Sequence, residues 1–233
     1  MSKYTKRFDG RKLDEPRKMK AEIGVIPNAD GSAMFSFGDT VAIAAVYGPK
    51  VMHPQHNQNP EKGTLRVNYD MLTFSVTERK RPGPSRRSQE ISKVTEWALE
   101  PAVMLEEFPN TVVDVHITIL QANASTRCAG INAAALALAH AGIPMKELIC
   151  SVSVGKLDKT LVVDVIKEEE DYEEGEGATD IAMSFTSNSG KLTQLQLDGN
   201  ISAKELQEAV EIGKKACKEI YELQKKTLKS LKE

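Results

Sequence analysis

The segment from residue 113 to residue 142 constrains the fold most, because a strand, a short polar turn and an alanine-rich helix follow one another directly in it. Every second residue of its first part is apolar, which is typical of a half-buried strand: Val113, Val115, Ile117 and Ile119. After the turn, Ala and Leu recur until Gly142 and Pro144, which are typical of a helix end. The sequence therefore predicts a strand joined to a helix by one short turn.

The turn between this strand and this helix contains Ser125, Thr126 and Arg127. The first N–H groups of a helix lack partners within the helix, and the positive end of the helix dipole favours an anion there. Two hydroxyls and a guanidinium at this place predict a phosphate site. The alternative is that Ser125 or Thr126 caps the first turn of the helix and that Arg127 is only solvated.

Composition limits the classes of protein to which the chain can belong. With 233 residues, 40% of them hydrophobic, and no evident linker, we expect one domain over residues 1–233. The three cysteines show no zinc-ligand spacing, and no segment resembles a signal peptide or a membrane span. We therefore expect a reduced, cytoplasmic protein without a membrane partner. The net charge of −2 argues against a generally basic surface, so any contact with nucleic acid requires a local patch.

Charge is distributed unevenly along the chain. Residues 77–94 contain six Lys or Arg and two Glu, whereas residues 168–176 contain seven acids among nine residues. Two prolines and a glycine exclude a helix from the loop at 78–85, and Arg86 and Arg87 then stand where the next helix begins. Cations at a helix start oppose the dipole at a cost of about 0.3–1 kcal/mol each. Their position suggests that an external polyanion neutralises them, and a solvated basic loop is the alternative.

The remaining pattern predicts an α/β fold. Strands are expected at residues 21–27, 33–37, 40–47, 65–76, 149–155, 160–166, 180–186 and 191–197. Helices are expected at residues 87–108, with a kink or an end at Pro101, and from a capping box at Ser202 onward. The first three strands form a meander, so the sheet is at least partly antiparallel. Residues 1–20 are expected to form an irregular lead-in at the surface.

Three features suggest one kind of chemistry: the phosphate turn, the arginine pair and Asp180 at the head of a strand. The sequence shows no evident Ser-His-Asp set and no Walker loop. Inorganic phosphate is a suitable nucleophile here, because it is already an anion and needs positioning more than a strong base. The leaving 3′ oxygen needs a proton or a metal ion, and a carboxylate can deliver either.

Four runs of sequence resemble the RNase PH family, and in particular the catalytic RNase PH-like subunits of archaeal exosomes. These runs are residues 79–93, 120–127, 8–11 and 196–199. The resemblance implies a two-layer α+β domain of the ribosomal protein S5 type, with a mixed sheet and packed helices, in a six-membered ring. It also implies reversible phosphorolysis, in which nucleoside diphosphates are removed from RNA 3′ ends.

The resemblance also assigns roles to residues already singled out. Ser125, Thr126 and Arg127 become phosphate binders, and Arg86 and Arg87 hold the RNA backbone. Tyr69 lies on the apolar side of a predicted strand, where a tyrosine is usually core. The resemblance instead makes it a platform on which a base stacks, a contact of about 1–3 kcal/mol.

Asp180 matches the second of the family's two catalytic acids and is the candidate ligand of Mg²⁺. The first acid stays open, because the acidic segment is several residues longer than the archaeal pattern. Glu174 has the expected spacing of six before Asp180, and Asp171 has the expected residue type. Asn123 and Ser125 stand where the family usually has Asp and Gly.

The function predicted from these assignments is a phosphate-dependent 3′→5′ exoribonuclease, with inorganic phosphate as co-substrate and Mg²⁺ as cofactor. The implied partners are single-stranded RNA, a related non-catalytic subunit in a hexameric ring, and RNA-binding cap subunits. The alternative is a non-catalytic ring subunit that scaffolds the complex and threads RNA. A homohexameric, tRNA-trimming RNase PH is a third possibility, against which the Pro-Gly-Pro run argues.

Overall fold

The computed structural model describes residues 4–78 and 80–230, in which nine strands form two sheets. The first sheet contains β1 (Met19–Ile23), β2 (Gly31–Phe37), β3 (Thr40–Val51), β4 (Thr64–Met71) and β5 (Thr111–Gln121). The second contains β6 (Ile149–Leu157), β7 (Thr160–Val163), β8 (Ala178–Thr186) and β9 (Leu192–Asp198). Four α-helices accompany them: α1 (Arg86–Leu99), α2 (Thr126–His140), α3 (Lys167–Glu170) and α4 (Ala203–Lys229).

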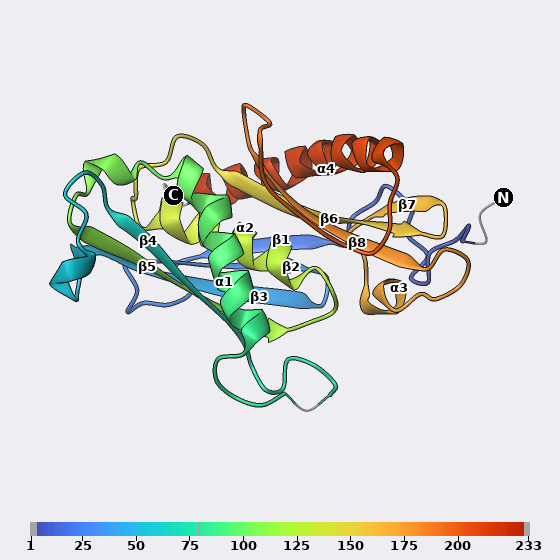
Figure 1. The fold of residues 1–233 in the computed structure, drawn as a ribbon, viewed down its shortest axis with the longest axis horizontal. Helices are drawn as coiled ribbons and strands as arrows, with labels where there is room; N and C mark the ends of the chain where they lie inside the picture. Colours follow the sequence, from blue (N-terminus) through green and yellow to red (C-terminus); the bar gives the residue numbers. More distant parts are fainter. Residues whose placement is uncertain (1–3, 79, 231–233) are drawn as a thin grey trace.

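The first sheet has the order β1-β2-β3-β5-β4. The predicted meander β1–β2–β3 is antiparallel, whereas β4 runs parallel to β5 and pairs Tyr69 with Ile117. The second sheet is antiparallel throughout, in the order β7-β6-β8-β9. Helices lie between the two sheets and outside the second one (Figure 1). The predicted α/β fold with a mixed sheet and packed helices is therefore confirmed.

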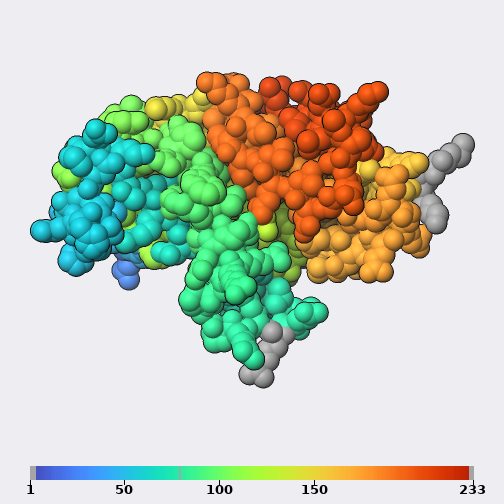
Figure 2. Space-filling view, in the orientation of Figure 1, coloured from blue at the N-terminus to red at the C-terminus, as the bar shows by residue number. Residues whose placement is uncertain are grey.

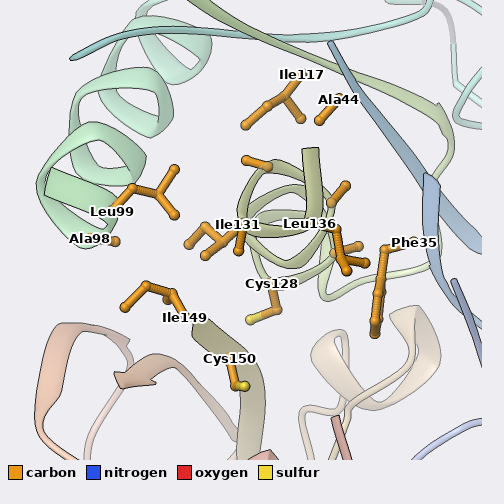
Figure 3. Packing of buried hydrophobic residues seen from close by; sticks show 14 of the residues in the cluster. Phe35, Ala44, Ala98, Leu99, Ile117, Cys128, Ile131, Leu136, Ile149 and Cys150 are labelled. Carbon is orange, nitrogen blue, oxygen red and sulfur yellow. The ribbon is translucent and has the colours of Figure 1, made fainter. Parts of the chain in front are cut away.

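Helix α2 lies at the centre of the core, between the two sheets (Figure 3). It is buried along nearly its whole length, and its small side chains let both sheets approach closely. On one side, a Cβ on Gly130 would lie 3.1 Å from Cγ2 of Ile117. On the other side, the Asn132 amide donates to the carbonyl of Ser151 and accepts from its N–H, both at 2.8 Å. The predicted strand, turn and helix thus become β5, the phosphate turn and the central helix.

Helix α4 covers the outer face of the second sheet. Gly213 of α4 lies against Met183 of β8, and the Gln224 amide donates to the carbonyl of Ile149 at 3.1 Å. The capping box predicted at Ser202 is present, with Glu205 as its partner. Met183 of β8 faces α4, and successive side chains of a strand point to opposite faces. The even-numbered residues of β8, Asp180 among them, therefore face α2 and the interior.

Some predicted boundaries were wrong. The helix expected at 87–108 ends at Leu99, and Pro101, where the sequence predicts a kink or an end, lies in the first of two short 3₁₀ turns that follow it. The strand expected at 65–76 ends at Met71, and the loop after it projects from the body of the protein (Figures 1 and 2). The strand expected at 160–166 ends at Val163, because Asp164 has a φ of 57°.

Residues 4–18 are irregular and mostly exposed, as the sequence predicts, but the side chains of Tyr4, Arg7 and Arg17 are buried; residues 1–3 lie outside the described part. The Arg7 side chain is fully buried and pairs with the buried carboxylate of Glu169, with Nη2 and Oε2 2.7 Å apart. The hydroxyl of Tyr4 donates to the same carboxylate at 2.7 Å. The hydrophobic periodicity and the composition of the sequence did not predict this contact, because Arg7 and Glu169 lie far apart in the chain.

Candidate active site

Tyr69 of β4 contacts two helices of the site. Its backbone N–H donates to Oγ of Ser92 in α1 at 2.8 Å, and its ring packs against Gly130 of α2. Burial raises the pKa of the Tyr69 phenol to about 12, and the Thr126 hydroxyl and the charges of Arg87 and Arg127 oppose the rise. Residues in the first turns of α1 and α2 therefore act on one buried phenol, whose oxygen has no hydrogen-bond partner among the described residues. The arrangement places positive charge and hydrogen-bond donors together.

Tyr69 itself is not a platform for a base. Its residue is 4% exposed, and its ring packs against Gly130 of the central helix. A base can stack only on an aromatic face that it can reach. The role that the resemblance implied for Tyr69 is thus not supported. Its place on the apolar side of the strand correctly indicated a core residue.

The turn before α2 has an unusual backbone. Ala124 and Ser125 have φ values of 54° and 53°, in the left-handed region. Ser125 is the N-cap residue, but its side chain accepts no hydrogen bond from the helix. Capping by Ser125 therefore does not explain this turn, and its side chain leaves the first N–H groups of α2 to another acceptor.

The Ser125 hydroxyl points into the protein. It lies 2.7 Å from Oγ of Ser153 and 3.0 Å from Oδ1 of Asp164. Only the backbone N–H of Ser125 can therefore face an anion, which corrects the expectation that its hydroxyl binds phosphate. The Asn123 side chain accepts the N–H of Lys167 at 2.9 Å, so this turn is tied to the start of α3.

Arg127 lies between α1 and the second sheet. One guanidinium nitrogen is 3.7 Å from Oε2 of Glu90 on α1. The other oxygen of Glu90 accepts from the amide of Gln196 on β9 at 2.6 Å. The charge of Arg127 also opposes the rise in the pKa of Asp180. Arg127 is thus a cation whose charge acts on Asp180.

Asp180 lies on the inner face of β8. Its Oδ1 is buried and has no hydrogen-bond partner in the described part of the chain. The pKa of Asp180 is raised to about 6, first by burial and then by the negative charge of Glu170, whereas the charge of Arg127 opposes the rise. A carboxyl with such a pKa can hold a proton close to neutral pH, as a general acid requires.

Both acids proposed as the partner of Asp180 are exposed. The side chain of Asp171 is 62% exposed, and its Oδ1 lies 2.7 Å from Nζ of Lys167. Glu174 is exposed in the loop after α3, and its charge acts on Tyr172. Glu170, the last residue of α3, contributes the largest effect of any charge on the pKa of Asp180. Glu170 is thus a third candidate for the first acid, and the assignment of Asp171 or Glu174 stays a prediction.

The pattern of the acidic run could not have revealed Glu170. Glu169 turns inward to pair with Arg7, and this contact sets the rotation of the short helix α3. Helix α3 packs against β8, which carries Asp180. The additional residues of the acidic run form a loop between α3 and β8, so spacing along the chain does not report distance from Asp180.

The carboxylates of Glu170 and Asp180 are suitable ligands for Mg²⁺. The described residues contain no group of three or more His, Cys, Asp or Glu that could hold a metal ion. Mg²⁺ commonly uses one or two carboxylates together with substrate phosphates and water. The unpartnered Oδ1 of Asp180 fits such a use. Asp180 as a metal ligand stays a prediction.

Arg86 and Arg87 are both exposed at the start of α1. Ser85 caps this helix, since its Oγ accepts the N–H of Ser88 at 3.0 Å. The cap satisfies one N–H group of the helix. The first turn of α1 contains no acid, so no side chain within it neutralises the two guanidinium groups. Their role in holding RNA stays a prediction.

Comparison with known proteins agrees with this geometry. Residues 15–144 match domain 1 of the 3′ exoribonuclease family, RNase PH, and residues 147–216 match its domain 2. The chain belongs to the RNase PH family. The family resemblance read from the sequence is thereby confirmed. The described part of this RNase PH family member contains no helix long and apolar enough to cross a membrane.

Several archaeal relatives carry the name exosome complex component Rrp41. The protein from Thermococcus kodakarensis is 50% identical over 224 residues, which cover 96% of this chain and 88% of that protein. The protein from Methanopyrus kandleri is 47% identical over 223 residues, which cover 96% and 92%.

Solved structures show the same fold. Rice Rrp46 has a TM-score of 0.85 at 26% identity, with 96% of this chain and 100% of that chain covered. An Archaeoglobus fulgidus exosome structure with RNA bound to the active site has a TM-score of 0.79 at 23% identity. That comparison covers 93% of this chain and 92% of the other, and at this identity it shows a shared fold alone.

Proposed function

We propose that the protein is a phosphate-dependent 3′→5′ exoribonuclease and the catalytic subunit of an exosome-type ring. One observation carries the proposal: the charge of Arg127, in the first turn of α2, acts on Asp180, whose pKa is raised by burial and by Glu170. An anion site and an acid close to each other are what phosphorolysis requires. The names of the archaeal relatives support the exosome assignment.

Inorganic phosphate binds at the first turn of α2 in this proposal. The N–H groups of Ser125, Thr126 and Arg127 are its donors, together with the Thr126 hydroxyl and the Arg127 guanidinium. A phosphate oxygen attacks the last phosphodiester phosphorus of the RNA. A bond from that oxygen to phosphorus forms, and the bond from phosphorus to the preceding nucleotide's 3′ oxygen breaks. The product is a nucleoside diphosphate, and reversal of the step extends RNA.

Asp180 supplies the proton for the leaving 3′ oxygen. A carboxyl whose pKa is about 6 is protonated often enough near neutral pH to act as a general acid. The alternative role of Asp180 is that of a metal ligand: ionised Asp180 and Glu170 would hold Mg²⁺, which would then supply the neutralisation of charge on the phosphoryl group in place of the proton. Arg86 and Arg87 hold the RNA backbone near the start of α1, so that the 3′ end reaches the bound phosphate.

Ring assembly follows from the small size of the basic patch. Each phosphate neutralised on a single strand contributes about 0.7 to the salt-dependence slope, so two exposed arginines bind RNA weakly. A hexameric ring with a related non-catalytic subunit, carrying RNA-binding caps, repeats the patch and raises the effective concentration of arginine. We therefore expect the chain to act together with such partners, in the cytoplasm.

The test is an assay of the chain, assembled with its partner subunit, on single-stranded RNA with and without inorganic phosphate. The expected result is degradation only with phosphate and release of nucleoside diphosphates. Absence of degradation under both conditions favours the non-catalytic ring subunit. Release of nucleoside monophosphates without phosphate contradicts the proposed chemistry.

A further inference from the structure

The phosphate turn keeps a conformation that its own residues disfavour. Ala124 and Ser125 both carry a Cβ, yet both lie in the left-handed region, with φ values of 54° and 53°. Residues with a side chain visit this region rarely, and two in succession require support from their surroundings. The support must come from the inner side of the turn, because its outer side has to stay open for an anion.

The first support is the hydroxyl of Ser125. The Ser125 hydroxyl donates its single proton into the interior, where Oδ1 of Asp164 at 3.0 Å and the carbonyl of Val165 at 3.2 Å can only accept. Ser153 can then donate to the same hydroxyl across 2.7 Å. Asp164 is 0% exposed, and a hydrogen bond to a buried carboxylate is among the stronger kinds. The hydroxyl is therefore fully used inside the protein.

The second support is Arg17. Its Nε donates to Oδ2 of Asp164 at 2.8 Å and its Nη2 donates to Oδ1 at 2.6 Å, so the buried carboxylate is neutralised. Its Nη1 also donates to the carbonyl of Asn123 at 2.6 Å, at the start of the turn. The Thr40 hydroxyl lies within hydrogen-bond distance of the carbonyls of Asn123 and Ala124, 2.9 Å from each. One buried group of side chains thus holds the turn from residue 123 to residue 125.

We propose that Ser125 is a positioning residue: its hydroxyl, bound to Asp164, fixes the left-handed turn that directs the first N–H groups of α2 at phosphate, and does not itself contact phosphate. The proposal rests on the proposed function, because it assigns the means by which the phosphate site is held in shape. Asp164 and Arg17 act through Ser125 and Asn123, and they are positioning residues of the same site.

Two substitutions at Ser125 separate positioning from direct binding. Ser125→Ala removes the hydroxyl and keeps the Cβ in a disfavoured conformation, whereas Ser125→Gly removes both the hydroxyl and the strain. A positioning role predicts that the KM for phosphate rises roughly tenfold in the Ala variant, the size of one lost hydrogen bond to a charged group. The Gly variant keeps a KM for phosphate within roughly threefold of the wild type, because glycine adopts the turn without support. The KM for RNA stays unchanged in both.

The experiment uses the assembled ring and compares both variants with the wild type. A second readout, independent of catalysis, is the shift in unfolding temperature that inorganic phosphate produces, which should fall in the Ala variant and persist in the Gly variant. An equal rise in KM in both variants would show that the hydroxyl binds phosphate, and no rise in either would show that the turn needs no support. Either outcome overturns the inference about Ser125 and leaves the proposed function standing. Absence of phosphate-dependent products from the wild type overturns the proposed function, and the inference with it.

Discussion

Replacement of Asp180 by Asn should abolish catalysis and stabilise the protein above pH 6. The native carboxyl has a pKa of about 6, against an ordinary value of 3.8. Between pH 3.8 and about pH 6, this group therefore binds more protons in the folded protein than in the unfolded protein. The contribution of the group to stability falls as pH rises through this window, and the cost is fully present above pH 6. The shift of about 2 units corresponds to about 2–3 kcal/mol, which the neutral Asn does not incur.

Urea unfolding at several pH values tests this reasoning, since urea does not screen charge. The Asp180→Asn variant should exceed the wild type by about 2–3 kcal/mol at pH 8, and the difference should shrink towards zero near pH 4. Phosphorolysis should fall by about 10²–10⁴-fold. Asp171→Asn is the matched control, because that exposed carboxylate pairs with Lys167 and should change stability by less than about 0.5 kcal/mol.

Two results would refute this account of Asp180. A loss of stability in Asp180→Asn at pH 8 would mean that the carboxylate is well satisfied in the folded protein. A gain that does not depend on pH would mean that the effect does not come from titration of this group. Either result would remove Asp180 as the general acid.

The other predictions concern the anion site, the second acid and the arginine pair. Arg127→Ala should reduce phosphorolysis by about 10²–10³-fold while RNA binding survives, and near-normal rates at saturating phosphate would exclude the assigned site. Glu170→Gln should reduce the rate by about 10²-fold whereas Asp171→Asn leaves it close to wild type; the reverse order in a rate assay would restore Asp171 as the acid. The double change of Arg86 and Arg87 to Ala should weaken binding of all RNA sequences and lower the salt slope by about 0.7 per lost phosphate contact; titrations at several salt concentrations with an unchanged slope would contradict this.

Local patterns predicted the parts of the fold that depend on local physics. Alternation identified the strand that became β5, and the Ala-rich run identified α2, because burial imposes these periods directly. The two prolines and the glycine before α1 predicted its start at Arg87, one residue after the start at Arg86 that the structure shows. The capping box at Ser202 marked the start of α4. Each signal lies within a few residues of the feature that it predicts.

The parts that sequence reasoning missed depend on contacts between distant segments. The charge of Glu170 acts on Asp180, and the orientation of the short helix that carries Glu170 depends on the contact of Glu169 with Arg7 of the N-terminal segment. The inward direction of the Ser125 hydroxyl likewise depends on a carboxylate 39 positions further along the chain. Neither spacing nor residue type contains such information, since both depend on how the segments pack.

The destination of radiolabelled inorganic phosphate tests the central claim most directly. If Arg127 and the start of α2 position phosphate for attack while Asp180 protonates the leaving oxygen, the assembled ring incubated with single-stranded RNA should place the label in the β-phosphate of released nucleoside diphosphates. Asp180→Asn and Arg127→Ala should each prevent that transfer. RNA degraded to unlabelled monophosphates, or label that stays in inorganic phosphate while the RNA remains intact, would contradict the account.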